Sequence, residues 1–237
     1  MFTVPHLVWL LVLGLLISLS LILLRRYKPP HLAVSRCVMV LLIIFKLFHL
    51  ALSMKQSAHG GMVLNQTQLS FHLCSIQIYF VILIHLIKNQ NTVKMLKSFM
   101  VPCMVIGATM SLLIPTEGVS VAHPRVWQYM LIHGVLIFYG LYLMLVEKVD
   151  LSFRAYVKNL GLLLIIVIMA FVMNSVLEQY ETNFLFLREP PMENLPVLNL
   201  DHGWFVYVGV LAAIAVTLVT IVHLPFMIRK RKKEQPV

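Results

Sequence analysis

A histidine and a cysteine lie two residues apart at the start of an apolar segment, within the stretch Phe71–Gln77. A cysteine thiol becomes a nucleophile when a neighbouring base takes its proton. Two such positions are separated by about 200° around a helix, so His72 and Cys74 cannot pair directly. If Cys74 is a nucleophile, its base must come from another helix. His72 is then left to position a substrate carbonyl or another side chain.

The composition indicates that this segment crosses a membrane. Of the 237 residues, 60% are hydrophobic and 12% are charged, whereas soluble domains have roughly 45–50% apolar and about 25% charged residues. Too little polar surface remains to cover a soluble globule. The 19 Lys and Arg outnumber the 9 Asp and Glu, but they cluster beside apolar runs, as in cytoplasmic loops. We therefore expect an integral membrane protein that does not bind nucleic acid.

Several segments are long enough to cross a hydrocarbon core about 30 Å thick, which takes roughly 20 helical residues. We count seven of them: residues 4–24, 34–54, 68–88, 96–115, 126–146, 156–178 and 203–228. Lys and Arg in the connections divide fifteen to three between the two sides. By the positive-inside rule, the sequence predicts an all-α bundle of seven transmembrane helices, N-terminus outside and C-terminus cytoplasmic. Residues 1–228 would form one domain, and 229–237 a basic tail that binds anionic lipid.

Four polar side chains on different spans are predicted to share one depth. At 1.5 Å per residue, Cys74 lies about 9 Å and His133 about 10 Å inside the outer ends of their spans. The same arithmetic puts His49 about 8 Å and Asn174 about 6 Å inside. If the helices pack with these groups inward, His133 is at the right depth to be the base for Cys74, because a neutral imidazole can accept the thiol proton.

Two further features suggest contacts with a ligand. Lys46 is the most costly residue of the second span, and its long stem can reach a polar cavity. The longest loop, residues 179–202, is too apolar for a free linker, and we expect it to lie back on the bundle. In this loop, Arg188 either grips a phosphate head group or pairs with a neighbouring glutamate, Glu189 or Glu193. The candidate substrate-binding residues are therefore His72, His49, Asn174, Asn183, Arg188 and Lys46.

Other polar residues have simpler structural interpretations. The three cysteines form no metal-ligand spacing, and we expect neither a metal site nor a cofactor. A buried cysteine is commonly a small hydrophobe, which is our interpretation of Cys37 and Cys103 and an equal alternative for Cys74 alone. We expect His85 and His223 to hydrogen-bond a neighbouring helix. Two glycines of the fifth span allow close helix approach: Gly134 and Gly140.

The order of several short motifs resembles the YwaF-type family of bacterial integral membrane proteins, over about residues 35 to 225. The motifs are His72-Leu73-Cys74, Gly107-Ala108 leading to Pro115, His133, and Asn183…Phe186-Leu187-Arg188…Pro190. That family is similar to animal transmembrane protein 164, an acyltransferase that builds ether phospholipids through a cysteine thioester. More distantly, it is similar to the androgen-induced membrane hydrolases, which use a threonine and a histidine. The resemblance implies a bacterial plasma membrane protein in which Cys74 matches the acyltransferase cysteine and His133 the histidine.

The leading hypothesis is therefore a membrane acyltransferase. It would move an acyl chain from a phospholipid, through a thioester on Cys74, to a lysolipid or another acceptor at the outer leaflet. The alternative is a small-molecule transporter or a non-catalytic lipid-binding protein, in which Lys46, His49, His72 and His133 line a polar cavity. A seven-span sensor ranks last, because only short loops and a basic tail are left to transmit a signal. The sequence carries no prediction of the oligomeric state.

Overall fold

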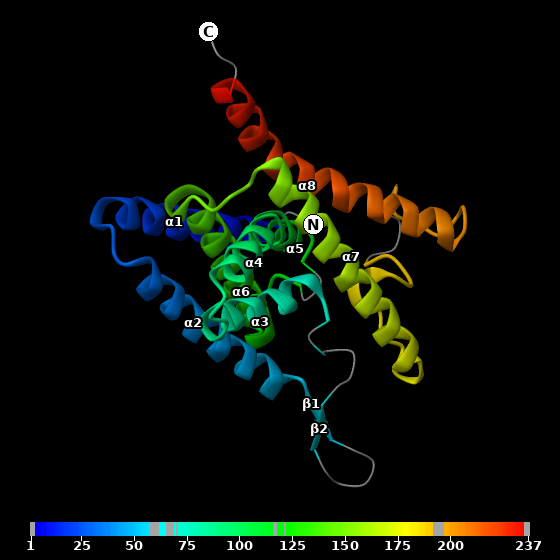
Figure 1. Cartoon of the computed structure of the whole chain (residues 1–237). Helices are drawn as coiled ribbons and strands as arrows, with labels where there is room; N and C mark the ends of the chain where they lie inside the picture. Colours follow the sequence, from blue (N-terminus) through cyan, green and yellow to red (C-terminus); the bar gives the residue numbers. More distant parts are fainter. Residues whose placement is uncertain are drawn as a thin grey trace.

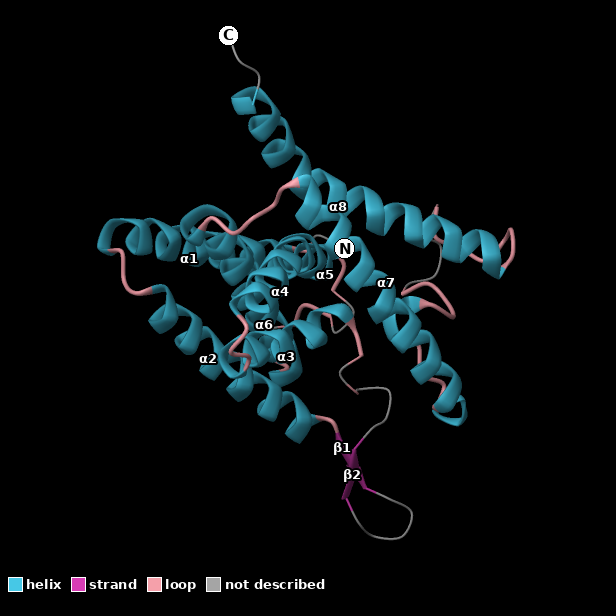
Figure 2. Cartoon of the chain, viewed as in Figure 1, coloured by secondary structure: helices cyan, strands magenta, loops and turns pink. Residues whose placement is uncertain are grey.

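The computed structural model describes residues 3–56, 62–64, 69, 71–115, 118–120, 122–191 and 197–234. The described part of the chain is nearly all helical (Figure 2). Its α-helices are α1 (Val4–Tyr27), α2 (His31–Leu52), α3 (Leu73–Leu86), α4 (Gln90–Pro102), α5 (Ala108–Leu113), α6 (Pro124–Tyr142), α7 (Phe153–Val176) and α8 (Trp204–Glu234). Two short strands, β1 (Met54–Gln56) and β2 (Met62–Leu64), pair antiparallel and extend away from the helices.

The prediction of an all-helical membrane protein is confirmed, with six to seven helices that could cross a bilayer. Six helical stretches in the described residues are long and apolar enough, among them the continuous stretches Gln90–Leu113 and Pro124–Glu147. The seventh, α3, has 14 residues and is thus about 21 Å long. It begins at Leu73 rather than at the predicted residue 68. At the other end of the chain, α8 continues through residues 229–234, where the basic tail was predicted to begin.

The helices from α3 to α6 occupy the centre of the bundle, with α1 and α2 on one side and α7 and α8 on the other (Figure 1). In the most apolar 18-residue stretch of each helix, buried residues make up 56% for Gln90–Leu113 and 50% for Pro124–Glu147. The corresponding shares are only 11% for α1 and 6% for α8. Apolar side chains on the outer faces of α1 and α8 suit lipid contact, because hydrocarbon tails are as apolar as the side chains themselves.

A proline divides the fourth crossing into two α-helices. Pro102 has no N–H to donate and its ring crowds the preceding turn, and the chain passes through a π-helical turn, Cys103–Gly107, before α5 begins. Such wide turns within helices are often found at functional sites. The Ser111 hydroxyl donates to the Gly107 carbonyl, at 3.1 Å, and the Thr109 hydroxyl donates to the Val105 carbonyl. These bonds satisfy carbonyls around the irregular turn.

The predicted role of the glycines in α6 is confirmed. A Cβ built on Gly140 would lie 2.8 Å from the Met104 Cβ and 3.2 Å from the Val105 backbone nitrogen. A Cβ on Gly134 would lie 2.9 Å from Leu13 Cδ2, at the end of a flexible side chain. The π-helical turn and α1 therefore approach α6 more closely than a larger residue would permit.

Alternating helix directions give the bundle two ends. We call one the Cys74 end; it contains the N-termini of α3 and α6 and the C-termini of α2 and α7. Arg125, at the start of α6, donates to the Leu52 carbonyl at the end of α2, at 2.9 Å. His6, near the start of α1, contacts the Leu112 carbonyl of α5 through Nε2, at 2.7 Å. The opposite end, which carries most of the Lys and Arg, is called the basic end.

Polar side chains at the basic end bond one helix to another. Two such bonds join α2 to α6: Ser35 to the Tyr139 hydroxyl, at 2.7 Å, and His31 to the Tyr142 hydroxyl, at 2.6 Å. Lys97 and Glu147 form an ion pair at 2.5 Å. The remaining members, which link α4, α7 and α8, are Ser98, Asn159 and His223. We call this set the basic-end network.

The two histidines predicted to join neighbouring helices differ. His223 does so, because its ring contacts the Leu151 carbonyl and the Asn159 amide, each at 3.0 Å. For His85 the prediction is wrong. Its Nδ1 contacts the Val81 carbonyl of its own helix, at 2.8 Å, because that carbonyl lies four residues earlier and one turn away.

Candidate functional site

Cys74 lies in the first turn of α3. His72 is the N-cap residue, and the first backbone hydrogen bond of the helix runs from the Ile76 N–H to the His72 carbonyl, at 3.0 Å. The N–H groups of the three residues in between, Leu73 to Ser75, precede this ladder. The His72 side chain does not cap them. Free N–H groups at a helix N-terminus attract negative charge, so this turn favours an anion beside the cysteine.

The Cys74 thiol contacts a serine that the sequence reasoning did not single out. Its Sγ lies 3.7 Å from Ser111 Oγ on α5. Because the serine hydroxyl donates to the Gly107 carbonyl, its oxygen is the acceptor and the thiol is the donor in this pair. The π-helical turn lies against the same place, since a Cβ on Gly107 would be 4.0 Å from Cys74 Sγ. The sequence feature that could have indicated Ser111 is its position, as a polar residue four positions before the end of the fourth apolar segment.

His133 is buried on α6 in a defined tautomer. Its Nδ1 lies 2.7 Å from the Tyr129 carbonyl, and because a carbonyl can only accept, Nδ1 carries the proton. The other nitrogen, Nε2, then presents a lone pair, as a general base requires. Among the hydrogen bonds of the described residues, Cys74 and His133 are not direct partners.

The α5 segment links the cysteine and the histidine. The Tyr129 hydroxyl donates to the Ser111 carbonyl at 2.8 Å, and the Tyr129 ring lies 4.4 Å from the His133 ring between centroids. The connected order is therefore cysteine, serine, tyrosine, histidine, from α3 through α5 to α6. Tyr129, like Ser111, is a polar residue near the predicted outer end of its span.

The loop after α7 covers the start of α3. Phe184 is fully buried and packs on Phe71, with ring centroids 5.1 Å apart, and on His72, at 5.7 Å. Phe186 lies 5.3 Å from the His72 ring. For its described residues, the prediction that the loop lies back on the bundle is therefore confirmed. His72 itself lies beneath this cover, two residues before Cys74 in the sequence, and its ring contacts these aromatic rings.

Asn174 and Asn183 hold this loop by its backbone. The buried Asn174 amide donates to the Phe184 carbonyl, at 3.1 Å, and accepts from the Phe184 N–H, at 2.7 Å. Asn183 donates to the Glu189 carbonyl, at 2.9 Å, and accepts from the Arg188 N–H, at 3.0 Å. Both amides thus have backbone partners, which accounts for them without a substrate.

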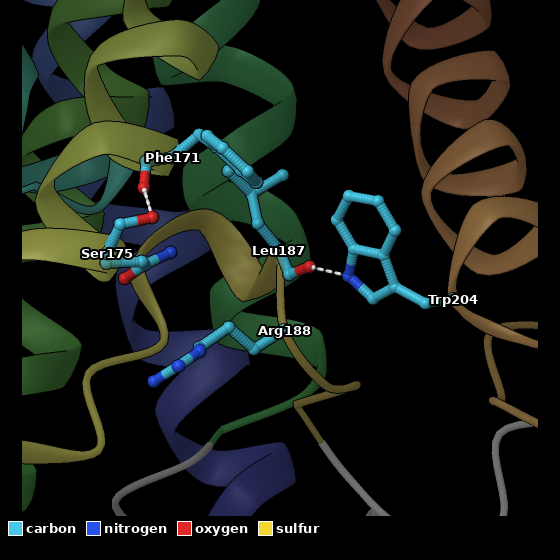
Figure 3. Close-up of a pocket in the computed structure, with 6 residues that line it drawn as sticks. Phe171, Ser175, Leu187, Arg188 and Trp204 are labelled. Atoms are coloured by element: carbon cyan, nitrogen blue, oxygen red, sulfur yellow. Dashed lines mark hydrogen bonds between the residues drawn. The ribbon is translucent and has the colours of Figure 1, made fainter. Parts of the chain in front are cut away.

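Arg188 lines a pocket of about 220 Å³ between α7, the loop and α8, together with Phe171, Asn174, Ser175, Leu187 and Trp204 (Figure 3). Its guanidinium pairs with Glu178 at 2.7 Å. The predicted glutamate partners were Glu189 and Glu193. The observed partner is Glu178, in the turn after α7, and Glu193 lies outside the described residues. Trp204 closes the pocket by donating to the Leu187 carbonyl at 2.7 Å.

Lys46 and His49 lie on the last turns of α2. Lys46 is partly buried and close enough to His72 to interact with it electrostatically. His49 is also partly buried, and its carbonyl accepts from the Ser53 hydroxyl at 2.7 Å. The four residues predicted to share a depth, His49, Cys74, His133 and Asn174, do occupy the same end of the bundle. The hydrogen bonds of the Cys74, His133 and Asn174 side chains go to three different partners.

The polar groups at this end do not form a metal site within the described part of the chain, where no three His, Cys, Asp or Glu side chains come together. Among the proteins compared with this chain, no curated protein and no solved structure gives a significant match. A family model does match, over residues 1–223, and its description is the TMEM164 family. That range contains every site residue discussed above, and the match agrees with the resemblance seen in the motifs. The chain therefore belongs to the TMEM164 family.

Proposed function

We propose that this protein is a membrane acyltransferase that carries an acyl group on Cys74. The observation that carries the proposal is the position of Cys74, in the first turn of α3 with its thiol donating to Ser111. A lone cysteine in an apolar core lacks such partners. Family membership supports the same class of chemistry, because the related animal protein is an acyltransferase. The charge distribution supports an orientation with the Cys74 end outside and the basic end in the cytoplasm.

In the first step, the Cys74 sulfur attacks the ester carbonyl of a phospholipid. The thiol loses its proton as the bond forms, and His133 Nε2 is the final acceptor of that proton. A C–S bond forms, the C–O bond to the glycerol backbone breaks, and the leaving oxygen takes the proton from His133. The products of this step are a thioester on Cys74 and a lysophospholipid.

In the second step, a hydroxyl of a lysolipid or another acceptor attacks the thioester carbonyl. His133 takes the hydroxyl proton, a new C–O bond forms, and the C–S bond breaks. The proton then returns to the sulfur, which restores the starting state. Water in place of the acceptor would give hydrolysis to a free fatty acid, so exclusion of water by the aromatic loop favours transfer.

We propose that the lipid lies with its head group near the loop and its acyl chains between helices. The Arg188 pocket offers a guanidinium, which binds phosphate through two parallel hydrogen bonds when its acidic partner is displaced. Glu178 is a suitable partner to displace, because its side chain is 74% exposed. His72 and Asn183 belong to this region through the loop, and Lys46 and His49 through the end of α2.

The proposal is tested by trapping the acyl-enzyme. The full chain is reconstituted in phosphatidylcholine vesicles whose lipid carries an alkyne-tagged acyl chain, and the protein is analysed by mass spectrometry. We expect a hydroxylamine-sensitive adduct on Cys74 that is absent from Cys74→Ser. Cys37→Ser is the matched control, because Cys37 is exposed on α2, and this variant should label as the wild type does. A wild-type protein without a thioester adduct would contradict the proposal.

One observation favours a second candidate, the transporter or lipid-binding protein without chemistry. Lys46 and His72 lie within electrostatic range of each other at the Cys74 end, as expected for side chains that line a polar cavity. Under this alternative, uptake or binding survives Cys74→Ala and is lost in Lys46→Ala. Loss of function in Cys74→Ala therefore supports the acyltransferase, whereas loss of uptake or binding only in Lys46→Ala supports the second candidate.

A further inference from the structure

Gln77 has an unpartnered amide in the interior of the bundle. Its side chain is fully buried, and neither Nε2 nor Oε1 has a hydrogen-bond partner in the part of the chain that the structure describes. In the described residues it is the one fully buried amide in which both polar atoms are unpaired. Asn174, also buried, satisfies both sides of its amide on the loop backbone. Leaving such a group unpaired costs about 1–3 kcal/mol, so its partner is to be sought outside the chain.

The unpaired amide lies one helical turn from Cys74, which precedes it by three residues. Helical side chains lean toward the N-terminus, so the Gln77 side chain covers the turn that contains Cys74. On one side of it around the helix, Ile76 packs with Phe99 and Cys103. On the other side, Cys74 contacts Ser111 and lies against Gly107. Gln77 lies between these two contacts around the helix, and this position points to a side chain that faces the π-helical turn.

The first turn of α3 adds three more donors at this place. The N–H groups of residues 73 to 75 precede the hydrogen-bond ladder of the helix, and no described residue outside the helix pairs with them. Two independent features thus converge beside the same sulfur: backbone N–H groups that precede the helical ladder, and a buried amide. Both kinds of group can donate to an oxygen, and within the described residues neither has an oxygen acceptor. This is the arrangement that stabilises charge developing on a carbonyl oxygen during acyl transfer.

We propose that Gln77 is a catalytic residue whose Nε2 donates to the carbonyl oxygen of the acyl group that Cys74 attacks. The inference rests on the proposed acyl transfer and extends it. When the C–S bond forms, the electron pair of the C=O bond moves onto the carbonyl oxygen. Gln77 and the α3 N–H groups hold this oxyanion by hydrogen bonds, without giving it a proton. When the C–O bond to the leaving oxygen breaks, the pair returns and the C=O bond reforms.

This role accounts for the presence of an amide where an apolar residue would pack better. Replacing an unpaired buried polar group by an apolar one of similar shape removes a desolvation penalty, and is neutral or stabilising. A structural amide would show the opposite sign, because its loss would break bonds within the fold. The sign of the stability change in Gln77→Met and Gln77→Leu therefore separates the two roles.

The test uses the full chain in vesicles of alkyne-tagged phosphatidylcholine and measures the rate of thioester formation on Cys74. We expect Gln77→Met and Gln77→Leu to lower this rate by about 10²–10³-fold, the usual loss for one oxyanion donor. In the same samples, modification of Cys74 by methyl methanethiosulfonate should change by less than about threefold, because that reaction develops no oxyanion. The melting temperature should stay the same or rise. Gln128→Met, which removes another buried glutamine, on α6, is the matched control and should acylate at the wild-type rate.

The outcomes distinguish this inference from the function on which it rests. If wild-type protein forms no thioester, both the acyl transfer and the role of Gln77 are wrong. If the wild type acylates and the Gln77 variants acylate equally fast, only the role of Gln77 is wrong, and the amide holds a buried water. If the variants lose thioester formation, methanethiosulfonate reactivity and melting temperature together, Gln77 is structural. Slow acylation with unchanged thiol reactivity and stability supports the inference.

Discussion

The two ends of the helix bundle use polar side chains in different ways. At the basic end, hydroxyls, an ion pair, an amide and two histidines bond helix to helix, so that α2, α4, α6, α7 and α8 are cross-linked. Two buried oxygens of this network, Glu147 Oε2 and Asn159 Oδ1, have no partner among the described residues, but each side chain bonds another helix through its other polar atom. At the Cys74 end, the buried polar groups around the thiol make fewer bonds between helices. The Gln77 amide has no hydrogen-bond partner among the described residues, and His133 uses one nitrogen on its own helix.

The comparison separates polar groups that hold the fold from those available for chemistry. In an apolar interior, a hydrogen bond between helices is stabilising, whereas an unmade one is costly. Such a cost persists where the unpaired group serves function and the surrounding structure is stable enough to tolerate it. The basic-end network and the close packing at Gly140 supply that stability. The following predictions exploit the difference, in order of decreasing expected effect.

The largest effect is expected for His133→Asn. The asparagine amide nitrogen can take the place of imidazole Nδ1 and keep the bond to the Tyr129 carbonyl, while Nε2 is lost. Thioester formation on Cys74 should fall by about 10²–10⁴-fold, the usual contribution of a general base. The melting temperature in detergent should change little. A variant that acylates at the wild-type rate would show that the proton leaves Cys74 by another route.

For Asn159→Leu, at the basic end, we expect lower stability and unchanged acylation, the reverse of the expectation for His133→Asn. This change removes three contacts, to the Ser98 carbonyl, the Ser98 hydroxyl and the His223 ring. Because buried partners are left unpaired, the loss should be about 1–3 kcal/mol of stability, visible as a lower melting temperature. At temperatures where the variant is folded, acylation of Cys74 should match the wild type. Loss of acylation in folded protein would contradict the separation of the two ends.

The glycines of α6 provide a smaller and more local comparison. Gly140→Ala should destabilise by about 1–3 kcal/mol, because the new methyl group overpacks against backbone and Cβ atoms that cannot move. Gly134→Ala should cost less, since the Leu13 side chain that it meets can change rotamer. Thermal unfolding of the two variants in one detergent measures the difference. Equal losses would mean that α1 is as rigidly packed as the π-helical turn.

The sequence predicted the depth of the candidate site in the membrane better than the side-chain contacts within it. Helix rise alone brings Cys74, His133 and Asn174 to one end, because depth depends only on residue counts. The partner of Cys74 depends on the rotation of α5, which follows a π-helical turn that hydrophobic periodicity does not reveal. Ser111 and Tyr129 were visible as polar residues near span ends, but depth gave no reason to prefer them.

The loop was harder to predict than the helices. Its apolar composition indicated that it would lie on the bundle, but not how. Leu185 and Phe186 adopt positive φ angles of 56° and 55°, a conformation that non-glycine residues rarely take. Asn174 and Asn183 hold the backbone there through bonds to main-chain atoms ten and six residues away. No sequence spacing specifies such bonds, so the sequence predicted both asparagines as substrate contacts and did not predict their bonds to the loop backbone.

The smallest effect is expected for the Arg188–Glu178 pair. Its side chains are 36% and 74% exposed, and an exposed ion pair contributes only about 0–1 kcal/mol, so Glu178→Gln should leave the melting temperature nearly unchanged. If Arg188 binds a phosphate head group, freeing its guanidinium should lower the apparent KM for phosphatidylcholine by a few-fold, and Arg188→Gln should raise it. If both variants have the wild-type KM, Arg188 holds the loop, as Asn174 and Asn183 do, and does not bind the head group. The Cys74 end would then recognise its lipid through the acyl ester and the chains rather than through the head group.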